Sequence, residues 1–155
     1  MSTSTKVSRI IKAPRHAVYK ACLNPNALAK WRVPENMTAH VHAFDAREGG
    51  TYRMSLTYQD PHHSPGGKTS KDADTFQGRF VELVPDEKIV EAIEFESHDP
   101  GFAGEMKMTT RLADAEDGTE VTILCENLPA GVRPEDNETG TRQSLRKLAA
   151  LLETG

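Results

Sequence analysis

The middle of the chain alternates hydrophobic and polar residues, which is typical of strands with one buried face. The clearest case is residues 51–58, where one face carries Tyr52, Met54, Leu56 and Tyr58. The same alternation recurs in residues 89–95, 106–112 and 121–125. Turn signals separate these runs, at Gly49–Gly50, Pro85–Asp86 and Glu116–Gly118. We therefore predict a meander of antiparallel strands between Met37 and Glu126.

Helical periods flank this region on both sides. A first strand over Thr5–Lys12 ends at Ala13–Pro14, and a short helix is predicted from Pro14 to Leu23. Asn24–Pro25 breaks it, and a second short helical turn follows over Asn26–Trp31. From Pro134 onward, the pattern predicts a helix of about twenty residues. Its apolar face carries Leu145, Leu148, Ala149 and Leu152.

The predicted elements are, in order, a strand, two short helices, further strands and one long helix. This is the order of the α+β helix-grip fold. In that fold a curved antiparallel sheet, here of about six or seven strands, wraps the C-terminal helix. Several short sequence motifs, which occur in the order typical of one known family, support the same interpretation. These are Pro14 to Pro25, Leu28 with Trp31, Gly49–Met54, Gly78 with Val84–Val90, and Gly118–Thr122. The chain resembles the START-like (SRPBCC, Bet v-type) superfamily, and within it the heat-shock-protein-90 ATPase activator homologue-like (AHSA-type), polyketide cyclase-related branch.

The resemblance covers nearly the whole chain and implies one START-like domain over residues 1–155. Two positions depart from the family's pattern. Trp31–Arg32 stands where a Trp-Trp or Trp-Phe pair is common, and Gly140–Thr141 stands where Gly-Trp often opens the last helix. The resemblance implies a ligand pocket between the sheet and the last helix, and both changes lie at its predicted mouth. The ligand preferences of the family are therefore not carried over to this chain. Co-chaperones of this branch carry an additional N-terminal domain, which we do not expect here, so the resemblance gives little support to a co-chaperone role.

Composition narrows the functional classes. The 155 residues carry 19 Lys+Arg against 23 Asp+Glu, a formal charge of −4, and no basic block that would indicate nucleic acid as a partner. The N-terminus lacks a secretory signal, and no apolar stretch is long enough to span a membrane. We expect a cytoplasmic protein without membrane insertion. Cys22 and Cys125 lack metal-ligand or redox spacing, so we expect buried free thiols and no cofactor.

A curved sheet with an amphipathic helix across its concave face leaves a space that suits a small apolar ligand. Our candidates for ligand contact are the following residues: Trp31, Tyr52, Met54, Tyr58, Arg79, Phe95, Met106 and Met108. Ordinary core packing is the alternative for each of them, and for Trp31 a hydrophobic plug. Met adapts to varied shapes, and a Tyr hydroxyl on a dry face needs a hydrogen-bond partner. Tyr52 and Tyr58 are therefore the expected polar anchors.

Ionisable residues give weaker signals. Glu91 shares a face with Ile89 and Ile93, where burial raises a carboxyl pKa unless the group is paired. We name it as a weak catalytic candidate with Arg79 as the expected partner, while a structural ion pair or an exposed strand end stays open. His40 and His42 point to one face of a predicted strand, so they are weak metal candidates. A solvated strand face is the simpler interpretation, and we expect no metal.

Three functions follow from this pattern and the resemblance. The first is binding of a small hydrophobic or amphipathic molecule, such as a lipid-like or aromatic metabolite. The second, implied by the resemblance, is a polyketide cyclase/dehydratase-type enzyme using the same cavity. The third is a stress-related protein-interaction or co-chaperone-like role. The sequence contains no phosphate-binding loop or nucleophile elbow. The ligand, a homodimer through sheet edges and the role of the loop at residues 60–72 stay open.

Overall fold

The structure is a computed structural model that describes residues 3–35, 37–58, 73–97 and 100–153. It contains one seven-stranded antiparallel sheet in the order β1-β7-β6-β5-β4-β3-β2. The strands are β1 (Thr5–Ile11), β2 (Met37–Phe44), β3 (Thr51–Tyr58), β4 (Ala73–Val84), β5 (Lys88–Phe95), β6 (Met106–Ala115) and β7 (Gly118–Glu126). The predicted meander from β2 to β7 is confirmed. Strand β1 pairs with β7 and forms one edge of the sheet.

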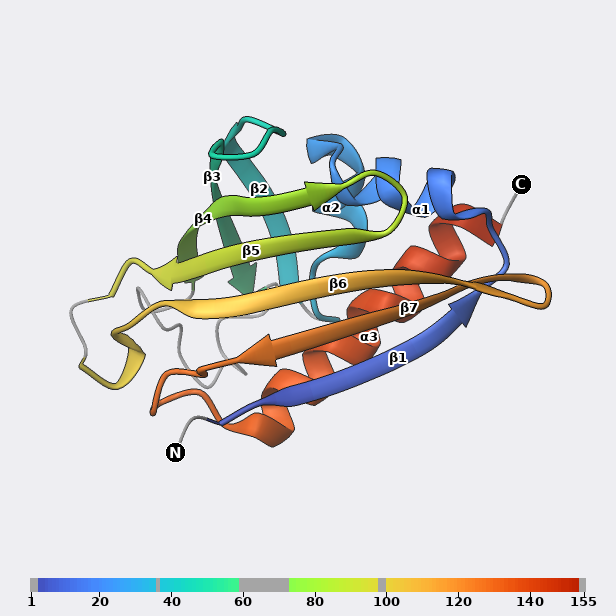
Figure 1. The fold of residues 1–155 in the computed structure, drawn as a ribbon. Coiled ribbons are helices and arrows are strands. Elements are labelled where there is room, and N and C mark those ends of the chain that lie inside the picture. The colour runs from blue at the N-terminus through green and yellow to red at the C-terminus, as the bar shows by residue number, and fades with distance from the viewer. Residues whose placement is uncertain (1–2, 36, 59–72, 98–99, 154–155) are drawn as a thin grey trace.

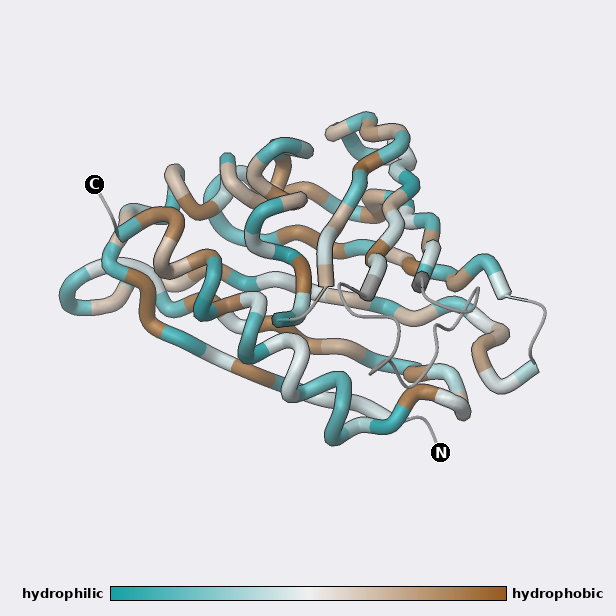
Figure 2. Tube along the Cα trace, turned by 180° about the vertical axis from the view of Figure 1, so that it is seen from behind, coloured by the Kyte–Doolittle hydropathy of each residue, from teal (hydrophilic) through white to brown (hydrophobic). Residues whose placement is uncertain are grey.

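The three α-helices lie where the sequence predicts them, whereas the short 3-10 turn between β5 and β6 was not predicted. The helical elements are α1 (Arg15–Cys22), α2 (Pro25–Trp31), a 3-10 turn η2 (Pro100–Phe102) and α3 (Pro134–Glu153). The sheet bends into a half-barrel, and α3 runs along its inner side, where it packs against β1, α1 and α2 (Figure 1). In the opposite view α3 lies in front of the sheet, with hydrophilic and hydrophobic positions alternating along it (Figure 2). This arrangement is the helix-grip fold.

The break between α1 and α2 comes from one short motif. Asn24 is the N-cap of α2, and its Oδ1 accepts hydrogen bonds from the backbone N–H groups of Asn26, at 2.8 Å, and Ala27, at 3.2 Å. Pro25 occupies the first helical position, where a missing N–H costs nothing. The Asn-Pro pair thus starts α2 at Pro25, one residue before the predicted Asn26.

Part of the hydrophobic core lies between α3 and the concave face of the sheet. From α3 it receives Leu145, Leu148 and Ala149, which are at most 2% exposed. Acidic residues in the first turn of α3, Glu135 and Asp136, complement the positive end of its dipole. The 3.6-residue period in the sequence correctly predicts that Leu145, Leu148 and Ala149 are buried, whereas Leu152, expected on the same face, is half-buried.

A glycine in β4 allows an aromatic ring to lie flat across the strand. Gly78 pairs with Tyr52 of β3 on one side and with Ile93 of β5 on the other. A Cβ atom on Gly78 would lie 2.1 Å from Cζ of Tyr52 and 2.4 Å from its hydroxyl oxygen. Because position 78 has no side chain, the phenol of Tyr52 crosses β4 and reaches the residues of β5.

Candidate functional site

Arg32 is positioned by the end of α2. It is the C-cap residue, and its backbone N–H donates to the carbonyl of Leu28 at 2.9 Å. The preceding Trp31 is 2% exposed, and its indole N–H donates to the carbonyl of Ala21 at 3.0 Å, which ties α2 to α1. From this fixed point the Arg32 side chain extends into the half-barrel, where 12% of it is exposed.

There Arg32 meets Glu91 of β5 and Tyr52 of β3. Arg32 Nη1 lies 2.8 Å from Glu91 Oε1 in a salt bridge, and Arg32 Nη2 donates to the Tyr52 hydroxyl at 3.1 Å. The Tyr52 hydroxyl in turn donates to the same Glu91 oxygen at 2.5 Å. Arg32 Nη2 also lies 3.6 Å from the sulfur of Met108. We call Arg32, Tyr52 and Glu91 the polar cluster.

Burial and neighbouring charges fix the protonation of two members of the polar cluster, Arg32 and Tyr52. Burial alone would lower the pKa of Arg32, but Glu91 and Tyr52 beside it raise that pKa above its ordinary value. Burial raises the pKa of Tyr52 well above its ordinary value; Arg32 works against this shift and Glu91 reinforces it. Arg32 is therefore charged and Tyr52 is neutral at physiological pH.

The expected partner of Glu91 is wrong, and the register of the sheet explains why. Glu91 pairs across the strands with Phe80, so Arg79 lies on the opposite face of β4. There Arg79 is 51% exposed, and its Nη2 lies 3.9 Å from Glu105. A β-bulge between Phe80 and Glu82 shifts the pairing, and a shift of this kind cannot be located from alternation alone. Glu91 itself is 3% exposed, on the concave face as its alternation indicated.

Sequence reasoning noted Arg32 as a departure from the family pattern but did not place it in the site. The signal was present in the chain. An Arg stands where an aromatic residue is common, and a Glu stands on an otherwise apolar strand face. A buried carboxylate needs a cation, and Arg is the residue best suited to a buried ion pair. Pairing the two departures would have found the polar cluster.

A row of aromatic rings leads away from the polar cluster. The Arg32 guanidinium carbon lies 5.6 Å from the ring centroid of Tyr52 and 5.9 Å from that of Phe76. Successive centroids from Tyr52 to Phe76, Phe95 and Phe102 are 6.3, 6.1 and 6.3 Å apart. Tyr52 and Phe76 are buried, at 2% and 6% exposed, whereas Phe95 and Phe102 are half-buried. The row, which we call the aromatic row, thus extends from the interior to the surface.

The remaining candidates divide into two groups. Met54, Met106 and Met108 are 1%, 6% and 8% exposed and belong to the buried core, on the same face as Tyr52 and Glu91. The structure therefore brings together Trp31, Tyr52, Met54, Phe95, Met106 and Met108 within one packed cluster. Tyr58 ends β3, but its side chain and the loop at residues 60–72 lie outside the described part of the chain.

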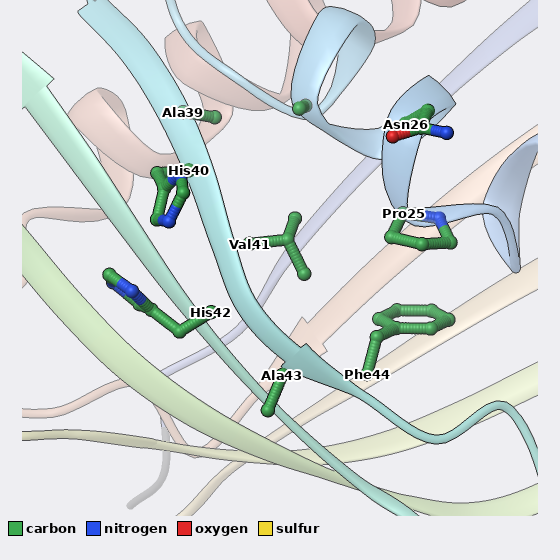
Figure 3. Close-up of a pocket in the computed structure, with 9 residues that line it drawn as sticks. Pro25, Asn26, Ala39, His40, Val41, His42, Ala43 and Phe44 are labelled. Carbon is green, nitrogen blue, oxygen red and sulfur yellow. The ribbon is translucent and has the colours of Figure 1, made fainter.

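Two open pockets occur on other parts of the molecule. One, of about 460 Å³, follows β2 from Ala39 to Phe44 and is bounded by Pro25, Asn26 and Ala29 of α2. In Figure 3, His40 and His42 point to one side of β2, whereas Val41 and Phe44 lie toward α2. The other pocket, of about 390 Å³, lies between α1, the start of α2 and the last turn of α3.

His40 and His42 lie on the same face of β2, as their spacing predicted. Their ring centroids are 4.6 Å apart, and His42 Nε2 is 2.7 Å from the hydroxyl of Ser55. Desolvation lowers the pKa of His42, and Arg53 and His40 add to this effect. In the described residues, no group of three or more His, Cys, Asp or Glu side chains is arranged to hold a metal ion.

Both cysteines are buried free thiols, as the sequence predicted. Burial raises the pKa of Cys22 from 9.0 to about 12, with a further contribution from the nearby Glu91. A protonated thiol is a weak nucleophile. Cys22 therefore contributes to the apolar surroundings of the polar cluster rather than to covalent chemistry.

The comparisons with known proteins fit this architecture. The family model described as "Activator of Hsp90 ATPase homolog 1-like protein" matches residues 12–153. The chain belongs to this family. Protein CV1439 from Chromobacterium violaceum, a crystal structure, is 37% identical with a TM-score of 0.86, and the match covers 98% of both chains. Family membership confirms the resemblance drawn from the sequence motifs.

More distant structures share the fold. A Rhodobacter sphaeroides protein is 18% identical with a TM-score of 0.79, over 97% of this chain and 92% of the other. An Arthrobacter aurescens protein is 17% identical with a TM-score of 0.78, over 98% and 87% of the two chains. No protein in the curated set matches the chain. In the described residues, no helix has the length and apolar character needed to cross a membrane.

Proposed function

We propose that this protein binds a small hydrophobic or amphipathic molecule between the concave face of the sheet and α3. The polar end of the molecule meets Arg32 of the polar cluster, and its apolar body lies along the aromatic row. The single observation that carries the proposal is the polar cluster itself. Its salt bridge joins Arg32 and Glu91, whose side chains are 12% and 4% exposed, and it lies at the inner end of the aromatic row.

The polar cluster is poorly explained by stability. Removing two charges from water costs several kcal/mol per ion, and hydrophobic residues of similar volume often replace a buried pair without loss. A domain of this size forms an adequate core from apolar residues alone. Perturbed ionisable groups held by burial and a specific partner are instead typical of binding and catalytic sites. Arg32 and Tyr52 both have such perturbed pKa values.

The aromatic row supports an apolar or aromatic ligand body. A bound aromatic group of ordinary size buries about 150–250 Å² of its surface. At about 25 cal/mol per Å² this burial contributes roughly 4–6 kcal/mol before the cost of association. Three methionines beside the row, Met54, Met106 and Met108, have flexible side chains that adapt to a guest.

A cyclase/dehydratase-type enzyme is the second candidate, and one observation favours it. Tyr52 keeps its proton because burial raises its pKa, so it has the protonation state of a general acid. Its hydroxyl, however, already donates to Glu91 at 2.5 Å. Arg32 likewise holds its proton, so neither residue is suited to accept one. Binding therefore explains the geometry with fewer additional assumptions.

Native mass spectrometry of the purified protein tests the proposed function. We expect a small molecule that stays bound under gentle conditions and is recovered after denaturation, or saturable binding of 2-naphthol by calorimetry. Phe95→Ala shortens the aromatic row and should weaken binding by tenfold or more. Val81→Ala is a matched control, because Val81 is 46% exposed. A bare protein mass together with no 2-naphthol binding would contradict the proposal.

Two further expectations stay predictions. The sheet order leaves β1 and β2 as its edges, so a homodimer through one of these strands is open to test by analytical ultracentrifugation. The cytoplasmic location is tested by fractionation of the cells that make the protein.

A further inference from the structure

We infer that the site selects neutral ligands, whose polar end is a hydroxyl or carbonyl oxygen, over carboxylates. The inference rests on the proposed function and adds a chemical class to it. It follows from two properties of the polar cluster, its charge balance and its inventory of hydrogen-bond donors.

The charges of the polar cluster already balance. Arg32 Nη1 and Glu91 Oε1 are 2.8 Å apart, and Tyr52 beside them is neutral. A ligand carboxylate arriving at Arg32 would place a second negative charge close to Glu91, in a region with little water. Charges are costly to bury unless each is paired. A hydroxyl or carbonyl group carries no such cost.

The hydrogen bonds of Arg32 leave two of its N–H groups, one on Nη1 and the one on Nε, without a partner among the described residues. A guanidinium has five N–H groups. In the described residues, Arg32 uses Nη1 toward Glu91 and Nη2 toward Tyr52 and Met108, and no bond involves Nε. No buried side-chain nitrogen or oxygen in this part of the chain lacks a partner. Because 12% of the Arg32 side chain is exposed, the guanidinium lies at the boundary of the core, where a ligand oxygen can approach its unused N–H groups.

The other members of the polar cluster do not offer a free donor. The Tyr52 hydroxyl donates to Glu91, and Glu91 Oε1 already accepts from both neighbours. The guanidinium carbon of Arg32 lies 5.9 Å from the centroid of Phe76, the second ring of the aromatic row. The guanidinium of Arg32 thus lies next to the aromatic row, along which the apolar body is proposed to bind. A ligand oxygen that accepts one hydrogen bond completes this arrangement.

Three probes with the same two-ring body test the inference. They are 2-naphthol, 2-acetylnaphthalene and 2-naphthoate, titrated into the full chain at neutral pH by calorimetry. We expect the two neutral probes to bind at least tenfold more tightly than 2-naphthoate. Glu91→Gln removes the negative charge and preserves the shape, so it should improve 2-naphthoate binding at least tenfold relative to 2-naphthol. Tyr52→Phe preserves both charges and should keep the wild-type order of affinities.

The outcomes separate this inference from the proposed function. If none of the three probes binds the wild-type protein and native mass spectrometry finds no bound molecule, the proposed function fails and the inference fails with it. If no probe binds but a small molecule is recovered, a neutral molecule supports the inference and a carboxylate overturns it. If 2-naphthoate binds as tightly as the neutral probes, the inference is overturned while the proposed function stands. Circular dichroism establishes that each variant is folded. If Glu91→Gln does not fold, the wild-type and Tyr52→Phe affinities decide the matter.

Discussion

Arg32→Met is the most informative single change in this molecule. It removes the cation of the polar cluster and keeps a side chain of similar length, so Glu91 stays buried without its partner. The structure sets the magnitude, because the salt bridge is 2.8 Å long and its side chains are 12% and 4% exposed. Breaking a buried pair from one side costs about 3–5 kcal/mol. We expect Arg32→Met to lower the free energy of unfolding by that amount.

Arg79→Met is the matched control. Arg79 is 51% exposed, and its nitrogen lies 3.9 Å from Glu105, which is 57% exposed. An exposed pair of this kind contributes about 0–1 kcal/mol. The same substitution at position 79 should therefore leave the free energy of unfolding nearly unchanged. The contrast between the two variants tests whether the partner of Glu91 is Arg32, as the structure shows, or Arg79, as the alternation suggested.

A third variant separates the penalty of an unpaired charge from the contribution of the pair. Arg32→Met combined with Tyr52→Phe and Glu91→Leu replaces the whole polar cluster by apolar groups. Because no charge is then left unpaired, we expect it to recover most of the stability that Arg32→Met loses. Recovery of stability together with loss of 2-naphthol binding would show that the polar cluster serves the ligand rather than the fold.

Urea unfolding at pH 7 gives the free energies. Trp31, the single tryptophan, is 2% exposed and adjoins Arg32, so its fluorescence reports unfolding at the site. Far-ultraviolet circular dichroism provides an independent probe of the sheet and α3, and agreement of the two supports a two-state analysis. The reasoning is refuted if Arg79→Met costs as much as Arg32→Met, or if Arg32→Met costs less than about 1 kcal/mol.

Four other substitutions test separate parts of the structure. Gly78→Ala places a Cβ atom 2.1 Å from Cζ of Tyr52 and should cost about 1–3 kcal/mol. In α3, Gly140→Ala places a Cβ atom 3.7 Å from the side chain of Pro34, an ordinary contact, and should stabilise the protein by about 0.5–1 kcal/mol. Equal effects of these two changes in thermal melts would contradict this account. Met106→Ala should lower stability in urea by about 2–5 kcal/mol, because this side chain is 6% exposed in the core, and a loss below about 1 kcal/mol would indicate open space there. Burial raises the pKa of Cys22 from 9.0 to about 12, so the contribution of this thiol to folding stability is fully present below pH 9 and is lost as the pH rises toward 12. Cys22→Ala should therefore reduce the alkaline loss of stability by up to about 4 kcal/mol. An unchanged pH dependence of the free energy of unfolding would refute the assignment.

Much of the fold follows from local sequence patterns. Alternation along β3 predicts which residues face the core, and Tyr52 and Met54 are indeed 2% and 1% exposed. The period of α3 predicts its buried face with the same accuracy, because both elements bury one side only. The Asn24–Pro25 pair marks the boundary between two short helices, although only the structure shows that Asn24 caps the second of them.

The polar cluster could not be predicted from local patterns because it joins residues that are far apart in the chain. Arg32 ends a helix, Tyr52 lies in β3 and Glu91 in β5, so their meeting depends on the register of β3, β4 and β5. The β-bulge after Phe80 changes that register. The absence of a side chain at Gly78 is equally decisive, because it opens the path between Tyr52 and Glu91. Nothing in the local sequence indicates which ring crosses that glycine.

The most direct test of the central claim is a nuclear magnetic resonance titration of protein labelled at the methionine methyl groups. Met54, Met106 and Met108 all lie on the concave face with the polar cluster and the aromatic row. We predict that 2-naphthol shifts all three methyl resonances saturably and with one common affinity. If these resonances stay fixed while 2-naphthol binds elsewhere, such as the pocket along β2, the ligand does not enter the half-barrel and the account is contradicted.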